Sequence, residues 1–372
     1  MFALNNKISL RQVQALLFLE IFGFGVTALP RRTAEHAAQD GWLGVVLAVF
    51  GALLITWLIT SVVKLNIGQT FYDYTKKLFG GFIASVFCLL LSIRFILLAA
   101  FYLRIFAEIT QVVMLPTTPF FVIFIAVLSL AAYGASKGIE ARGRLAEMLI
   151  LIVLLPLIFV FGISSKEIDF TNLLPLFAAN STEIGKAGYQ AFFAFGGIEF
   201  LLLISPFLSR PKGFRKSAMG TIATMGGFMV IITAVTIARF GPLNVVAHNW
   251  PVLKMMDTVS LPGSIIDRQG ALIMTFWIIS AYAIINAALF FSSLLLKDVA
   301  KRGKHIHYIL LCLPIIALAA NIPSDLDQVY EWFNLYNNTF GVATMVGLPL
   351  IIFVASMIRK GRDKIAQQKA NI

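Results

Sequence analysis

The stretch FAFGGIE, at residues 193–199, places two adjacent glycines and a carboxylate at the centre of an otherwise apolar segment. In the other half of the chain, a second long apolar segment is interrupted by GFG at residues 23–25. Glycine lowers helix propensity, and irregular backbone persists inside a bilayer only where it is buried in protein or lines a polar cavity. Paired breaks in two halves of a chain are typical of transporter folds with a midplane site. We therefore expect a small-molecule site inside a membrane.

The composition is that of a membrane protein. Of 372 residues, 59% are hydrophobic, 13% are charged and 33 are Phe. A hydrocarbon layer of ~30 Å requires ~20 apolar residues at ~1.5 Å per residue, and such segments recur along the chain. They predict an all-α membrane protein with ten transmembrane helices, at residues 10–30, 42–63, 82–115, 119–137, 145–163, 188–207, 218–239, 269–296, 306–322 and 338–358. The first segment carries Arg11 and Glu20 and lacks a cleavage pattern, so we expect it to stay as a span rather than be removed as a signal peptide.

The distribution of Lys and Arg predicts the orientation, because short cytoplasmic loops retain positive charge during insertion. Of 30 such residues, 21 fall on one side of the predicted spans, here named the basic side, and seven on the other. This count places Arg142 in a basic loop and leaves Arg94 and Arg104 inside a span. Both termini are expected to be cytoplasmic. The net charge of +12 is divided among six loops rather than gathered on one face, so we expect no nucleic-acid partner.

Ionisable residues inside the predicted spans form a second set of candidates. Glu20 precedes the first glycine break, Glu199 follows the second, and Arg94 lies in the third span. A charge at such a position is costly unless it is paired, protonated or hydrated, so these groups are candidates for coupling or gating, with a structural ion pair as the alternative. Arg94 needs a partner from another span, and either glutamate could serve. Arg104 and Glu108, four residues apart on a helix, are expected to satisfy each other.

Three stretches on the less basic side are longer than the turns that join the other spans: 164–187, 240–268 and 323–337. The second contains Pro242, Pro251 and Trp250, which favour short interfacial helices that could act as a lid, a partner surface or a structured cap. The third has three acidic residues and no basic one, which predicts a solvated acidic loop.

The sequence offers no catalytic constellation. Its four histidines fall in loops or at span ends, and Cys88 and Cys312 lie inside predicted spans, where they are expected to pack as small apolar residues. There is no nucleotide-binding glycine loop, no zinc-spaced Cys/His set and no serine nucleophile motif. We therefore expect no enzymatic activity, no metal site and no cofactor.

A series of short motifs extends along almost the whole chain, and their order and spacing are characteristic. They are Ile8-Ser9, Gln12, Pro30, Asp40-Gly41-Trp42, Leu115-Pro116, Thr118-Pro119, Gly138, Ala141-Arg142, Leu145-Ala146-Glu147, Asn172-Leu173-Leu174-Pro175, Gly241-Pro242, Pro251 and Trp277. Together they make the chain resemble the endospore germination permeases, the integral-membrane B subunits of spore germinant receptors. The stretch 244–249 departs from the family pattern because it lacks charged residues.

This resemblance implies the fold of the amino acid/polyamine/organocation transporter superfamily. In that fold, two inverted five-helix repeats with broken first and sixth helices would occupy residues 1–163 and 188–358. An outer connecting loop at 164–187 and a basic cytoplasmic tail at 359–372 would complete the chain. The resemblance further implies an amino acid or similar small nutrient as ligand, A-type and lipoprotein C-type partner subunits, and a location in the spore inner membrane.

The resemblance also places the site between the first and sixth spans, flanked by the third and eighth. A ligand carboxylate would accept hydrogen bonds from N–H groups at the start of the outer half-helix, near Gly25, Val26 and Thr27, and the ligand ammonium would meet the carbonyls that end the inner half-helix. The candidate ligand-binding residues are Gly23, Phe24, Gly25, Val26, Thr27, Tyr102, Phe195, Gly196, Gly197, Tyr282 and Asn286. The alternatives are that the glycines only permit close packing and that the three polar side chains only make interhelical hydrogen bonds.

The sequence thus predicts a spore germinant receptor subunit that binds a small germinant and passes the signal to partner subunits through a change in conformation. Two alternatives remain open at this point. One is a stand-alone proton- or sodium-coupled amino-acid permease, in which Glu20 or Glu199 carries the coupling charge. The other is a structural scaffold for other membrane subunits, with a vestigial pocket.

Overall fold

The computed structural model describes residues 6–22, 24–113, 115–164, 168–257 and 269–370. Within these ranges the chain is almost entirely helical, and its only extended pairing is an isolated bridge between Ile8 and Leu208. The expectation of an all-α protein is therefore confirmed.

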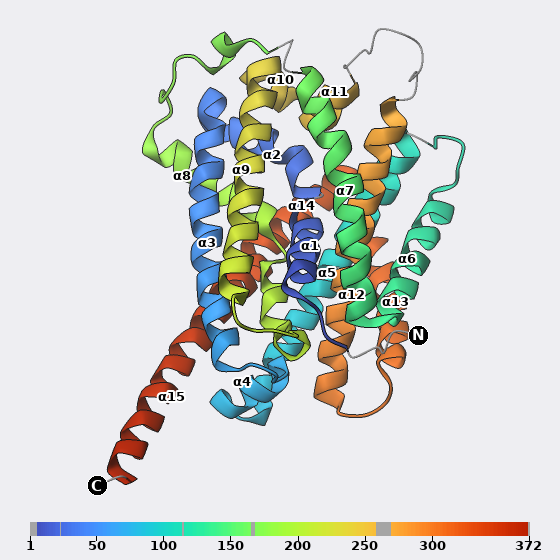
Figure 1. The fold of residues 1–372 in the computed structure, drawn as a ribbon. Coiled ribbons are helices and arrows are strands. Elements are labelled where there is room, and N and C mark those ends of the chain that lie inside the picture. The colour runs from blue at the N-terminus through green and yellow to red at the C-terminus, as the bar shows by residue number, and fades with distance from the viewer. Residues whose placement is uncertain (1–5, 23, 114, 165–167, 258–268, 371–372) are drawn as a thin grey trace.

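The α-helices of the first half follow one another with short connections. They are α1 (Leu10–Phe22), α2 (Phe24–Ala37), α3 (Gly41–Leu65), α4 (Phe71–Phe79), α5 (Gly81–Val113), α6 (Phe120–Ser136) and α7 (Gly138–Ser164). Those of the second half are α8 (Ser181–Phe192), α9 (Phe214–Phe240), α10 (Pro242–Ala247), α11 (Pro251–Asp257), α12 (Gln269–Ala300), α13 (His305–Ala320), α14 (Leu326–Tyr336) and α15 (Leu348–Ala370). Figure 1 shows α1 in the middle of the bundle, α3 and α9 along one side, and α6 and α13 along the other.

Several helical stretches are long and apolar enough to cross a membrane. Five such stretches lie in the described residues: Val26–Leu65, Gly81–Val112, Phe214–Phe240, Trp277–Ala300 and Leu326–Gly361. The bent pair Phe120–Ser136 and Gly138–Leu154, which meet at 117°, makes a sixth if it is counted as one span. These helices have the architecture of a multi-pass membrane protein, whereas ten spans and two inverted repeats stay predictions.

The outside of the bundle is apolar as well as the inside. Large exposed apolar side chains lie on several long helices, among them Phe50 and Leu54 of α3, Phe82 of α5 and Leu318 of α13. Such extended apolar surface is rare on a soluble monomer but is required where the solvent is hydrocarbon. The two free cysteines, Cys88 and Cys312, are buried, as expected for small apolar residues.

Of the two predicted glycine breaks, the one at residues 196–197 lies within the described residues. The first predicted break falls on Gly23, which lies outside the described residues between α1 and α2, so it stays a prediction. In the second break α8 is followed by two 3-10 segments, η4 (Phe193–Phe195) and η5 (Ile198–Leu203), with Gly196 and Gly197 between them. Gly197 has a φ of 111°, in the left-handed region that only glycine enters at little cost. The interruption predicted at residues 196–197 is therefore confirmed.

The helix before the second break begins earlier than predicted, at Ser181 rather than at residue 188. Its first turn is closed by a capping box, in which the Asn180 side chain accepts from the Glu183 N–H and the Glu183 side chain accepts from the Asn180 N–H. This pairing satisfies two donors that a helix start otherwise leaves free, and so fixes the start of α8.

The prediction of an acidic loop at 323–337 is wrong, because most of this stretch is α14. Val329, Phe333 and Tyr336, four and three residues apart, share one helix face and are buried. The acidic side chains that suggested a loop lie before the first turn, as the N-cap Asp325, or within the helix. Between α14 and α15 the chain continues as two π-helical segments, η7 (Asn337–Gly341) and η8 (Ala343–Gly347).

The short helices expected in 240–268 are present as α10 and α11, while residues 258–268 lie outside the described part.

The expected location of Arg142 is wrong. This residue was counted among the basic loop residues, but it lies in α7 with its side chain buried.

Candidate functional site

The second break lies against α1 and α2, the helices on either side of the first predicted break. Both α1 and α2 contact η4, the segment that precedes the second break. A Cβ atom on Gly197 would lie 3.7 Å from Cγ1 of Ile21, the penultimate residue of α1. Val26, Thr27 and Phe195, three of the predicted ligand-binding residues, are buried beside this junction, and Phe24 and Gly25 are the first two residues of α2. The fold thus brings together two segments that are far apart in the sequence.

A buried ion pair joins the second break to α5. Nε of Arg94 lies 3.2 Å from Oε1 of Glu199, the second residue of η5, and the two side chains are 1% and 0% exposed. The other carboxylate oxygen, Oε2, accepts from the Gly197 N–H at 3.1 Å. Glu199, rather than Glu20, is therefore the partner of Arg94. The same carboxylate also holds the backbone of the break in its left-handed conformation.

Tyr336 of α14 covers the other side of Arg94. Its hydroxyl donates to the Arg94 carbonyl at 2.8 Å, and its ring centre lies 4.2 Å from the guanidinium carbon. An aromatic face at this distance attracts a buried cation. Arg94 Nη1 is buried and has no hydrogen-bond partner among the described residues. Tyr336 was missed by the sequence analysis because its segment was taken for a loop, although the spacing of Val329, Phe333 and Tyr336 could have indicated a helix.

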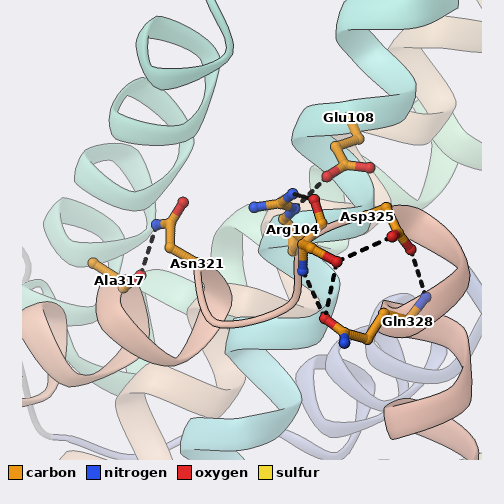
Figure 2. A network of polar contacts seen from close by, with 7 residues as sticks. Arg104, Glu108, Ala317, Asn321, Asp325 and Gln328 are labelled. Carbon is orange, nitrogen blue, oxygen red and sulfur yellow. Dashed lines mark hydrogen bonds and ion pairs between the residues drawn. The ribbon is translucent and has the colours of Figure 1, made fainter.

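A polar network fixes the start of α14, as Figure 2 shows. Arg104 of α5 pairs with Glu108, as the spacing predicted, and its Nη2 donates to the Ser324 carbonyl at 3.3 Å. Asp325, the N-cap of α14, accepts from the Gln328 N–H at 2.8 Å, and this hydrogen bond lowers the pKa of Asp325. The Gln328 side chain accepts in turn from the Ser324 N–H at 2.7 Å. The network anchors α14 to α5 and so holds Tyr336 over Arg94.

A second buried ion pair joins α1 to α7. Nη2 of Arg142 lies 3.0 Å from Oε1 of Glu20, and the side chains are 3% and 4% exposed. Nε of Arg142 donates to the Asn286 side chain at 2.6 Å, and the Asn286 amide donates to the Ala131 carbonyl at 2.8 Å. The Arg142 guanidinium thus joins α7 to α1 and α12, and Asn286 extends the network to α6. Sequence reasoning missed Arg142 because it assigned the residue to a loop.

The predicted ligand-binding side chains line two different cavities. Tyr102 lines one between α2, α5, α8, η4 and α14, together with Arg32, Phe193, Tyr330 and Phe333. Tyr282 and Asn286 line the other, beside Glu20 and Arg142. Each cavity has a volume of ≈ 20 Å³, which is room for about one water molecule. The structure therefore does not bring Tyr102 together with Tyr282 and Asn286, and neither cavity has room for an amino acid.

No group of three His, Cys, Asp or Glu side chains in the described ranges is arranged to hold a metal ion. The charged chemistry of the site comes instead from the two ion pairs, each made by one Arg and one Glu.

The model of the spore germination protein family matches residues 7–329. This chain belongs to that family. Relatives extend the match to nearly the full length. Spore germination protein YndE of Bacillus subtilis (strain 168) is 24% identical over 367 residues, which cover 98% of this chain and 100% of the relative. Spore germination protein B2 of the same organism is 23% identical, with 97% and 99% covered, and spore germination protein GerLB of Bacillus cereus is 22% identical, with 96% of each covered.

Family membership and the long apolar helices agree that the chain is a multi-pass membrane protein of spore germination. The family expected from the short motifs is therefore confirmed. The match runs through both glycine breaks and both buried ion pairs, since all of these residues lie within 7–329. Tyr336 lies beyond that range.

Proposed function

We propose that this protein is the integral-membrane subunit of a spore germinant receptor. It binds a small nutrient, most simply an amino acid, where its two broken segments meet. It then passes the signal to A-type and lipoprotein C-type partner subunits, which triggers germination. The observation that carries the proposal is the contact of η4 and Gly197 with α1 and α2 beside the Arg94–Glu199 pair, in a chain of the spore germination protein family.

The backbone at the breaks supplies the chemistry for a zwitterion. With the chain interrupted at Gly23, as we propose, the amides of Gly25, Val26 and Thr27 stand at the positive end of a helix and suit a carboxylate, and the last carbonyls of α1 suit an ammonium group. The cavity beside Tyr102 adjoins these amides, because Ala28 of α2 and Ala194 of η4 both line it. It is the route by which a ligand would reach the break.

Binding requires this region to open. A cavity of ≈ 20 Å³ cannot hold an amino acid, so the aromatic side chains that close it, among them Phe193 and Phe333, must move as the ligand enters. A ligand that binds only the open arrangement shifts the equilibrium toward it. Movement of η4 also reaches Glu199 through the Gly197 N–H, and then Arg94 and Tyr336. Ligand binding is thereby coupled to the positions of α5 and α14.

We also propose the finer architecture. Ten spans form two inverted repeats, at 1–163 and 188–358, with α1 and α2 in one and α8 to η5 in the other as the equivalent broken helices. Residues 164–187 connect the repeats on the outer side, and 359–372 form a cytoplasmic tail. Both termini face the cytoplasm, the location is the spore inner membrane, and the protein has no enzymatic activity of its own.

A stand-alone proton- or sodium-coupled amino-acid permease is the second candidate. The observation that favours it is the burial of two carboxylates. Glu20 lies in α1, shortly before Gly23, and Glu199 lies in η5, shortly after Gly197. Uptake of a labelled amino acid into proteoliposomes, driven by a proton or sodium gradient, separates the two proposals. A permease accumulates the substrate without partner subunits, whereas a receptor subunit binds it without accumulation.

Ligand-dependent thermal stabilisation tests the proposed site. The purified full-length protein is unfolded in detergent in the presence of the common amino acids, several sugars and nucleosides, because a ligand that binds only the folded state raises the unfolding temperature as its concentration passes the dissociation constant. Gly25→Leu and Gly197→Leu block the backbone of the two breaks and should abolish the shift.

The matched control is Gly227→Leu, in α9. A Cβ atom on Gly227 meets nothing within 4 Å, so this variant adds the same side chain without touching the site. It should respond like the wild type. A normal response in both break variants would overturn the site, and no response of the wild type to any compound would favour a scaffold. Copurification with a lipoprotein C-type subunit tests the partner assignment.

A further inference from the structure

A larger cavity lies away from the two breaks, on the basic side, between the end of α3 and the start of α9. Its volume is ≈ 340 Å³, far more than that of either cavity of the candidate site. The helices that enclose it contact each other, as Figure 1 shows. The residues that line it are Thr60, Val63, Lys64, Ile67, Leu208, Pro211, Lys212, Gly213, Phe214, Arg215 and Lys216.

Four cations and no carboxylate line this cavity. Lys64 comes from α3, and Lys212, Arg215 and Lys216 come from the loop before α9 and its first turn. None of the four makes an ion pair with a carboxylate of the described residues. Insertion topology explains why basic residues lie on this side of the membrane. It does not explain why four of them converge on one cavity, where like charges repel unless an anion is present.

Arg215 is held in place and keeps unused donor capacity. Its Nη2 donates to the Ser61 hydroxyl at 2.7 Å, and its guanidinium lies 5.6 Å from the centre of the Trp57 ring. Its Nε is buried without a hydrogen-bond partner among the described residues. The start of α9 adds further donors, since Gly213 caps it without a side-chain hydrogen bond. The N-terminal amides of a helix carry partial positive charge and bind anions.

Apolar side chains also line the cavity. Val63, Ile67, Leu208 and Phe214 line it together with the cations, and Ile67 is exposed. Along α3, one and two turns from Ser61, the side chains of Trp57 and Leu54 are also exposed, which continues an apolar strip toward the centre of the membrane. A ligand that matches both features has an anionic head and an apolar tail.

We propose that this cavity binds the phosphate headgroup of an anionic phospholipid, with an acyl chain along the exposed face of α3. A planar guanidinium with free N–H groups suits phosphate oxygens, and lysines add point charges around it. Basic pockets between transmembrane helices are suited to such headgroups. The site is independent of the germinant site, since none of its residues lines the cavities near the breaks.

The test compares phosphatidylglycerol, phosphatidylcholine and inorganic phosphate as stabilisers of the full-length protein in detergent. Phosphatidylglycerol should raise the unfolding temperature until the site is saturated, and phosphatidylcholine should not. Salt at roughly 0.5 M should reduce the stabilisation by phosphatidylglycerol, because it screens the attraction between the cations and the headgroup. The double variant Lys212→Gln/Lys216→Gln removes two exposed cations and keeps Arg215, so it preserves the contacts with Ser61 and Trp57. It should bind phosphatidylglycerol roughly 10- to 30-fold more weakly.

Lys76→Gln/Lys77→Gln is the matched control, because these lysines are also exposed and lie in α4, outside the cavity. It should retain wild-type affinity. Equal loss of affinity in the two double variants would mean that only the total charge matters and would overturn the site. Stabilisation by inorganic phosphate with no further gain from phosphatidylglycerol would show a free-phosphate site and overturn the lipid assignment. Absence of any shift with phosphatidylglycerol would overturn both.

Discussion

Arg94 and Glu199 are almost fully withdrawn from solvent, so each depends on the other for compensation of its charge. Removing one partner of such a pair leaves an isolated buried charge and costs ~3–5 kcal/mol, although the intact pair itself adds little net stability. The same argument applies to Arg142 and Glu20. These pairs therefore restrict which arrangements of the core are possible more than they strengthen the fold.

Replacement of Glu199 by Gln should lower the free energy of unfolding by roughly 3–5 kcal/mol, because the Arg94 charge stays buried without a counter-charge. The double variant Arg94→Gln/Glu199→Gln should be less destabilised than the sum of the single variants, with a coupling of about 0.5–3 kcal/mol. The measurement is chemical unfolding of each variant in the same detergent.

The control for this cycle is Glu35→Gln, in the pair that Arg31 and Glu35 form on α2. Its side chains are 34% and 38% exposed, so solvent screens the charges and the change should cost only about 0–1 kcal/mol. Strict additivity of the Arg94 and Glu199 substitutions would show that the two charges do not interact in the folded protein.

At this scale the sequence predicted which residues carry unusual charge but not how they pair. Glu20, Arg94 and Glu199 were recognisable because an ionisable side chain in an apolar span is costly. The choice between the two glutamates depends on how α1, α5 and η5 pack, which residue spacing in one chain does not reveal. Arg142 was missed because loop counting treats every Arg near a predicted span end as solvated. The spacing of Arg142, Ala146 and Leu149, four and three residues apart, could have indicated one helix face. In the structure all three line one cavity.

At the scale of elements, the contact between α6 and α12 depends on the absence of a side chain at Gly134. A Cβ atom there would lie 2.2 Å from the Tyr282 hydroxyl oxygen and 2.7 Å from the Asn286 amide nitrogen. Small residues at such positions let membrane helices approach closely. This close approach brings Asn286 within reach of the Ala131 carbonyl and of Arg142.

Gly134→Ala should therefore destabilise the protein. The gain in helix propensity is at most about 1 kcal/mol, whereas the new methyl group must displace the Tyr282 hydroxyl and the Asn286 amide, and such overpacking costs about 1–3 kcal/mol. Tyr282→Phe should restore part of the loss, because it removes the oxygen at 2.2 Å but leaves Cζ at 3.2 Å. Thermal unfolding of the single and double variants measures both effects.

Gly227→Ala serves as the control, since its new methyl group meets nothing within 4 Å. It should be neutral or slightly stabilising through helix propensity alone. If Gly134→Ala matched it, the α6–α12 contact would be looser than the structure has it.

The docking of α14 on α5 gives another prediction. Tyr336→Phe removes only the hydrogen bond to the Arg94 carbonyl and should cost about 0.5–1.5 kcal/mol, while Tyr336→Ala also removes the ring over the guanidinium and should cost about 3–5 kcal/mol. Tyr308→Phe, which loses an exposed hydrogen bond to the Arg302 carbonyl, should change the free energy of unfolding little. Equal effects of Tyr336→Phe and Tyr308→Phe would argue against a role for the buried bond.

The sequence predicted the interruption at Gly196 and Gly197 correctly because a left-handed backbone conformation leaves a direct mark in residue type. It failed at α14 for the opposite reason. The helix carries acidic residues on one face and buried apolar ones on the other, so average polarity indicates a loop while the 3.6-residue period indicates a helix. Amphipathic helices such as α14 are therefore missed when a segment is assigned from its average composition.

At the scale of the whole molecule, the orientation can be tested with introduced cysteines. Cys88 and Cys312 are buried, so the native background should be low. Lys186→Cys, in α8, should react with a membrane-impermeant maleimide in intact cells, and Lys76→Cys, in α4 on the basic side, should react only after the cells are disrupted. Both side chains are exposed in the structure. The reverse pattern would invert the predicted topology, and labelling of both from one side would contradict a membrane between them.

The two π-helical segments in the stretch from Leu326 to Gly361 have a mechanical consequence. A π turn holds one residue more than an α turn, so conversion of either segment to α geometry shifts the register of everything beyond it by one position. Such a shift rotates one end of the helix against the other by about 100° but moves it only about 1.5 Å along the axis. Tyr336 holds Arg94 on one side of these segments, and Arg359 contacts the Lys77 carbonyl on the other. Conversion of one π turn would therefore reach the other end of this stretch mainly as a rotation rather than as a displacement along the axis.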